Sequence, residues 1–105
     1  MEIIETSVFT RQVQQFFSDD EYRLLQSALI QHPDIGQVIP HSGGLRKMRW
    51  TLREKGKRGG ARIIYFWAIS KEQLLMLFIY AKNQTDDLSV DQIRQLESII
   101  RKDYP

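Results

Sequence analysis

The sequence contains no cysteine among its 105 residues, which excludes disulfide bonds, thiolate metal sites and cysteine nucleophiles. Only two histidines are present, His32 and His41, and their nine-residue separation fits no helical or hairpin pair of metal ligands. Asp86, Asp87 and Asp91 could attract a cation. However, acidic residues before and within the first turn of a helix are explained by the helix dipole. We therefore expect neither a metal ion nor another cofactor.

Long hydrophobic runs are also lacking. The two longest, Ile63–Ile69 and Leu74–Ala81, fall far short of the roughly 20 residues that a membrane helix needs. The first residues, MEIIETSV, show no basic segment followed by an apolar one, so we expect no secretory signal and a cytoplasmic protein. No serine lies in a strand-to-helix elbow, and Gly43–Gly44 is an isolated glycine pair rather than a phosphate-binding loop.

Acidic residues are nearly absent from one basic stretch, Leu45–Arg62 (LRKMRWTLREKGKRGGAR). This basic stretch carries eight of the fifteen Lys and Arg residues and a single carboxylate, Glu54, so its charge is +7 while the rest of the chain sums to −5. A solvated strand face usually mixes signs. Concentrated positive charge attracts phosphate backbones and releases their counterions. We therefore favour contact with RNA over simple solvation, and nearby aromatic residues could stack on exposed bases, although most are explained as core: Trp50, Tyr65, Phe66, Trp67 and Tyr80.

Local signals predict three helices. Thr6 or Ser7 can cap the first, and Ser18 with Glu21 forms a capping box for the second, which ends before Pro33. A second capping box, Ser89 with Gln92, begins the last helix.

Strands are predicted from alternation and from branched and aromatic content. Glu2–Glu5 is a short first strand, and Arg46–Glu54 alternates apolar and cationic residues. Ala61–Ile69 and Gln73–Lys82 are apolar on both faces and are expected at the centre of an antiparallel meander. The chain is therefore predicted to be one α+β domain over residues 1–105, in the order β-α-α-β-β-β-α, with a mainly antiparallel sheet packed by helices.

Cleaving RNA internally without histidine is chemically feasible for such a cluster. Arginine can stabilise charge at phosphorus with fixed bidentate geometry. A lysine can move protons if its pKa falls, and neighbouring cations depress the pKa of a lysine. His41 could act as a base, but an exposed loop histidine following Pro40 is the simpler interpretation.

The motifs GLRKMRW, GARIIYFW and LLMLFIYAKNQTDDLS, with a Gly/Lys/Arg-rich loop after the first, resemble the RelE/HigB family of bacterial toxins. The resemblance covers essentially the whole chain. It implies a compact sheet with helices on one side, and a metal-independent, ribosome-dependent endoribonuclease that cleaves translated mRNA in the ribosomal A site by 2′-OH attack. It also implies a cognate antitoxin protein as partner, besides the 70S ribosome, ribosomal RNA and mRNA. Operator DNA would be contacted only through the antitoxin, and no membrane is involved.

The resemblance also assigns roles to residues. Arg62 matches the family's transition-state arginine, and Lys82 matches the basic position at the end of the last strand. Trp50 and Leu52 occupy the places where relatives carry lysines, so the resemblance does not assign the general base, for which we choose Lys55 or Lys57. Besides these catalytic residues, we predict six residues that bind RNA: Arg46, Lys47, Arg49, Arg53, Arg58 and Tyr80.

Two alternatives stay open. The basic stretch could serve a non-catalytic module that binds RNA or the ribosome, or the chain could be an inactive family member kept as an interaction partner. The adjacent reading frame would bear on the class, since a small helix-turn-helix protein is the expected antitoxin.

Overall fold

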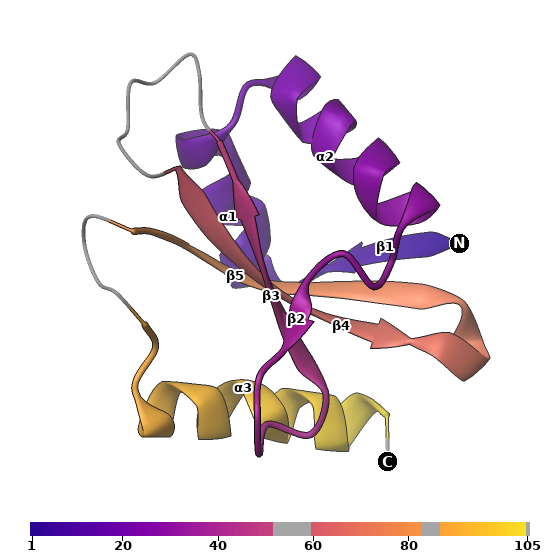
Figure 1. Cartoon of the computed structure of the whole chain (residues 1–105), viewed down its shortest axis with the longest axis vertical. Helices are drawn as coiled ribbons and strands as arrows, with labels where there is room; N and C mark the ends of the chain where they lie inside the picture. The colour runs from indigo at the N-terminus through magenta and orange to yellow at the C-terminus, as the bar shows by residue number, and fades with distance from the viewer. Residues whose placement is uncertain (52–59, 83–86, 105) are drawn as a thin grey trace.

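A computed structural model describes residues 1–51, 60–82 and 87–104. Within these ranges it is a compact α+β fold with a mixed five-stranded sheet and three α-helices (Figure 1). In chain order the elements are β1 (Glu2–Glu5), α1 (Ser7–Phe16), α2 (Asp19–Gln31), β2 (Gln37–Val38), β3 (Leu45–Trp50), β4 (Ala61–Ala68), the 3-10 turn η1 (Ile69–Lys71), β5 (Gln73–Ala81) and α3 (Val90–Asp103).

The sheet has the strand order β1-β5-β4-β3-β2. The predicted meander is confirmed, because β3, β4 and β5 pair antiparallel in sequence, and β1 pairs parallel with β5. The two-residue strand β2 is absent from the elements that the sequence predicts. It pairs Gln37 with Lys47 and Val38 with Arg46 at the sheet edge. Two exposed residues carry no periodicity from which a strand could be recognised.

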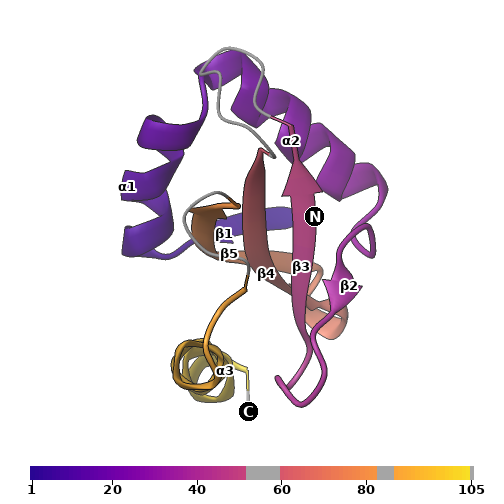
Figure 2. The ribbon, with the colours of Figure 1, turned by 60° about the vertical axis from the view of Figure 1, so that its left-hand side comes forward.

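Helices cover both faces of the sheet. One apolar cluster joins α1 and α2 to the sheet, with Phe9 and Leu25 packed on Ile63 and Tyr65. A second cluster joins α3 to the opposite face, where Ile100 belongs with Leu45, Ile64, Leu75 and Leu77. Figures 1 and 2 show α3 separated from α1 and α2 by the sheet. The expectation of helices on one side is therefore wrong for this chain, because β3, β4 and β5 each present apolar residues to both faces.

The predicted helix starts are confirmed. Thr6 caps α1 by accepting a hydrogen bond from the Phe9 amide at 3.1 Å. Both capping boxes form, at Ser18 for α2 and at Ser89 for α3. These signals are local, so they act whatever the helix packs against.

A β-bulge changes the phase of β5. Ile64 pairs with Phe78, but the next residue of β4, Tyr65, pairs with Met76, so Leu77 is an extra residue. The side chains that follow the bulge therefore face the opposite way from those in a regular strand. Beyond the bulge, Phe78 and Tyr80 join the α3-side cluster.

The outer edge of β5 is hydrogen-bonded by α1 where β1 ends. The Thr6 hydroxyl donates to the Leu77 carbonyl at 3.1 Å. The Gln12 side-chain amide donates to the Ile79 carbonyl at 2.9 Å, and its oxygen accepts from the Ile79 amide at 2.8 Å. Gln12 thus substitutes for a neighbouring strand at the residue before Tyr80.

Candidate nucleic-acid interface

Three polar side chains lie in register across the sheet. Arg49 of β3 pairs with Arg62 of β4, and Arg62 pairs with Tyr80 of β5. Side chains of directly opposed residues lie on the same face, about 4.5–5.5 Å apart at Cβ. The face is the one that α3 covers, since Tyr80 belongs to the α3-side cluster. We call Arg49, Arg62 and Tyr80 the cross-strand row.

Arg62 is the most unusual member of the cross-strand row, because only 5% of its surface is exposed. Its guanidinium reaches the carbonyl of Ala61 at 3.5 Å, at the limit of a hydrogen bond. The residue directly opposite is a second arginine, the exposed Arg49. Like charges directly opposed on neighbouring strands destabilise a sheet, and burying a charge adds a further cost. Two cations of the cross-strand row therefore lie side by side on the α3 face of the sheet.

Tyr80 is 4% exposed, and its ring packs against Phe78 with centroids 6.4 Å apart. The ring is therefore enclosed in the core and not open to stack on a base. Within the part of the chain that the structure describes, its hydroxyl has no hydrogen-bond partner. Burial raises the pKa of Tyr80, the charge of Asp87 raises it further, and the charge of Arg62 opposes them. The phenol stays protonated at neutral pH and can act as a donor.

Lys47 extends the positive surface next to the cross-strand row, and it is paired with Asp87. Lys47 lies two residues before Arg49, and its Nζ contacts the Asp87 carboxylate at 2.9 Å. The lysine side chain is 32% exposed and the aspartate 68%. The helix dipole alone does not account for Asp87. The sequence gives no signal for this contact between two residues 40 positions apart.

Arg46 lies apart from these residues. It is opposite Tyr65, whose ring belongs to the cluster under α1 and α2. Its guanidinium donates to the Gly36 carbonyl at 2.8 Å and lies 5.9 Å from the centre of the Trp67 ring. The structure therefore divides the basic stretch: Lys47 and Arg49 face α3, whereas Arg46 braces the loop before β2 on the other face.

Lys82 is exposed and follows β5 directly. Its backbone amide donates to the Gly60 carbonyl at 3.4 Å. It lies one residue beyond the pair of Ala61 with Ala81, where the sheet between β4 and β5 ends. Four other predicted site residues lie outside the described residues: Arg53, Lys55, Lys57 and Arg58.

Gly60 lets β4 begin tightly against the end of β3. Its φ is +67°, and an added Cβ would lie 2.3 Å from the Trp50 carbonyl oxygen. A side chain cannot be accommodated there without moving one strand. Gly60 immediately precedes Ala61, which pairs with Trp50. That pair is next to the pair of Arg49 with Arg62 in the cross-strand row.

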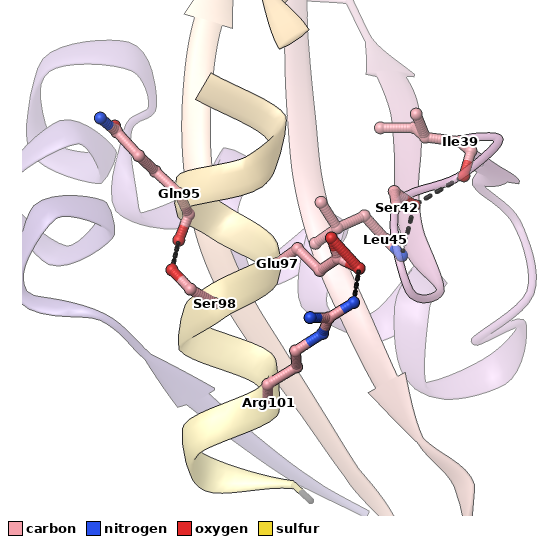
Figure 3. A network of polar contacts seen from close by, with 7 residues as sticks. All are labelled: Ile39, Ser42, Leu45, Gln95, Glu97, Ser98 and Arg101. Atoms are coloured by element: carbon pink, nitrogen blue, oxygen red, sulfur yellow. Dashed lines mark hydrogen bonds and ion pairs between the residues drawn. The ribbon is translucent and has the colours of Figure 1, made fainter. Parts of the chain in front are cut away.

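The opposite end of β3 is held by a buried serine (Figure 3). Ser42 is 1% exposed; its hydroxyl donates to the Ile39 carbonyl at 2.6 Å and accepts from the Leu45 amide at 3.0 Å. The loop lies against α3, because a Cβ on Gly43 would meet Glu97 Oε2 at 2.9 Å. Glu97 in turn pairs with Arg101 at 3.0 Å, as Figure 3 also shows. These contacts define where β3 begins.

Histidines, metal ligands and membrane-spanning helices are the other features that bear on function in the described residues. Within residues 1–51, 60–82 and 87–104, no three His, Asp or Glu side chains gather as metal ligands. His41 is an exposed loop residue with φ +57°, next to Ser42 at the far end of β3 from Arg49. None of the helices in the described ranges is long and apolar enough to cross a membrane. A scan of the sequence against models of known protein families gives no match.

Proposed function

We propose that this chain is a ribosome-dependent mRNA endonuclease of the RelE/HigB type, the toxin of a toxin–antitoxin pair. The observation that carries the proposal is the opposition of two arginines in the cross-strand row, one of them buried. A phosphodiester is attracted by both cations and can accept hydrogen bonds from both guanidinium groups. The parallel β1, the two helices and the antiparallel β3–β4–β5 meander support a RelE-like fold.

Arg62 is the group best suited to the transition state. The 2′-OH attacks phosphorus, negative charge develops on the non-bridging oxygens, and a 2′,3′-cyclic phosphate forms as the 5′-oxygen leaves. A guanidinium buried in a low-dielectric site stabilises that charge more strongly than one in water. Lys82, at the end of β5, is assigned to the leaving group side, and Lys55 or Lys57 remains the proposed base.

The proposed partners follow from charge. Lys47, Arg49 and Lys82 would contact ribosomal RNA or the message, and an acidic or amphipathic antitoxin segment would either cover the same surface or pack elsewhere and distort the site. Operator DNA would be contacted through that antitoxin, in the cytoplasm.

A second candidate is a non-catalytic RNA-binding or ribosome-binding module. One observation favours it: in the described ranges neither histidine lies near the cross-strand row, since His41 is at the far end of β3 and His32 follows α2. Binding requires only the cations, whereas cleavage also requires a group that removes the 2′-OH proton.

Cleavage separates the two candidates. On expression of the chain in bacteria, primer extension on translated mRNA should reveal new 5′ ends within codons. Arg62→Ala should reduce their yield by about 10²–10³-fold, the loss typical for one transition-state donor. Arg62→Lys should also lose most activity, because it keeps the charge without the bidentate fork. Lys82→Ala should lower activity as well.

The matched controls are Arg11→Ala on α1 and Lys102→Ala on α3, both exposed cations away from the cross-strand row. Melting temperatures identify variants that fail to fold. Full activity in both Arg62→Ala and Lys82→Ala would show that the site assignment is wrong. New 5′ ends absent even with the wild-type chain would favour the binding module.

A further inference from the structure

Among residues 1–51, 60–82 and 87–104, the Tyr80 hydroxyl is a buried donor without a protein partner. Two buried side-chain polar atoms lack a hydrogen bond within the described residues, Tyr80 Oη and Trp67 Nε1. Leaving such a group unsatisfied costs about 1–3 kcal/mol. Tyr65, on the neighbouring strand, shows the usual solution: its hydroxyl donates to the Pro33 carbonyl at 2.7 Å and accepts from the Gly36 amide at 2.9 Å.

The two unsatisfied groups differ in their surroundings. Trp67 packs with the cluster under α1 and α2, on the face away from the cross-strand row. Tyr80 is instead directly opposite Arg62, and its ionisation responds to the charges of both Arg62 and Asp87. The donor of Tyr80 therefore lies beside a buried cation, where an anion would be attracted.

The β-bulge at Leu77 places Tyr80 opposite Arg62. If β5 continued past Met76 in regular register, so that Leu77 paired with Ile64, Ile79 would lie opposite Arg62 and Tyr80 would turn toward the α1 and α2 side. Ile79 is the residue before Tyr80 in β5. The side chain of Gln12 makes two hydrogen bonds to the backbone of Ile79. The bulge and its support put the phenol, and not an isoleucine, into the cross-strand row.

We propose that the Tyr80 hydroxyl is a phosphate ligand, donating a hydrogen bond to a non-bridging oxygen of the same phosphate that Arg62 binds. The inference rests on the proposed function of the cross-strand row and adds to it a neutral donor at the reacting group. Because the phenol remains protonated, it acts as a donor and not as a general base. A bound phosphate would replace Asp87, the exposed carboxylate that contacts Lys47.

The test uses the purified full chain titrated with inorganic phosphate at constant ionic strength, followed by NMR chemical shifts. Tyr80→Phe should weaken phosphate binding by about tenfold, the loss expected for a hydrogen bond to a charged group. Without phosphate, Tyr80→Phe should melt at or above the wild-type temperature, because it removes an unsatisfied buried hydroxyl. A purely structural role predicts the opposite melting shift.

Tyr65→Phe is the matched control: it should lower the melting temperature, since two hydrogen bonds are lost, and leave phosphate affinity unchanged. Unchanged phosphate affinity in Tyr80→Phe would overturn the inference, as would a wild-type chain that binds no phosphate. Phosphate binding lost in Tyr80→Phe, together with no mRNA cleavage by the wild type, would support this inference while contradicting the endonuclease proposal.

Discussion

At the scale of single residues, the cationic surface already contains one anion of its own. The Asp87 carboxylate contacts Lys47 at 2.9 Å, and its charge acts on Tyr80. A carboxylate and a phosphate oxygen attract the same donors. If a phosphate binds the cross-strand row as proposed, Asp87 would compete with it for Lys47.

Asp87→Asn should consequently strengthen phosphate binding, by about two- to fivefold. The gain is modest because both partners are partly exposed, and such ion pairs contribute only about 0–1 kcal/mol. Titration with phosphate at fixed ionic strength measures it. Asp91→Asn removes the same charge from the exposed first turn of α3 and is the control. An equal gain in both variants, or none in Asp87→Asn, would contradict the competition.

At the scale of elements, the position of Tyr80 depends on how α1 holds the edge of β5. β1 pairs with β5 only as far as Met76, and the side chains of Thr6 and Gln12 continue the hydrogen bonding to Leu77 and Ile79. A helix side chain thus supports the strand segment that carries a proposed phosphate ligand.

Gln12→Ala should destabilise the chain by about 1–3 kcal/mol, because the buried carbonyl and amide of Ile79 lose their partner. Amide hydrogen exchange should accelerate at Ile79 and Tyr80 more than in β3. Gln95→Ala, which truncates an exposed glutamine on α3, should change neither quantity. Protection of Ile79 retained in Gln12→Ala would show that the bulge does not need this support.

The helix starts could be predicted from the sequence, whereas the bulge in β5 and the pairing of Arg62 could not. Ser18 with Glu21, and Ser89 with Gln92, predict helix starts from capping boxes that span three positions. Both starts are confirmed. The bulge at Leu77 could not be predicted, because LLMLFIY is apolar at every position and either phase buries it equally well. The place of Arg62 at the start of a central strand followed from composition, whereas its pairing with Arg49 and Tyr80 required the register.

At the scale of the whole molecule, the charge is asymmetric. The basic stretch carries +7 and the remainder −5, so the net charge of +2 gives only a weak overall attraction for RNA. The proposed binding of RNA would then depend on local contacts. Arg46 shows that membership of the basic stretch is not enough, because the fold directs its guanidinium to Gly36 on the other face.

The salt dependence of RNA binding tests whether the surface acts locally. With an uncleavable 2′-O-methyl oligonucleotide, the slope of log affinity against log salt should become shallower by about 0.7 in Arg49→Ala, the value of one phosphate contact to a single strand. Fluorescence anisotropy over a salt series measures the slope. Arg11→Ala removes the same net charge from the exposed surface of α1, on the far side of the sheet, and should leave the slope unchanged. If Arg11→Ala made the slope as shallow as Arg49→Ala does, the attraction would come from net charge. That result would contradict a phosphate contact at the cross-strand row.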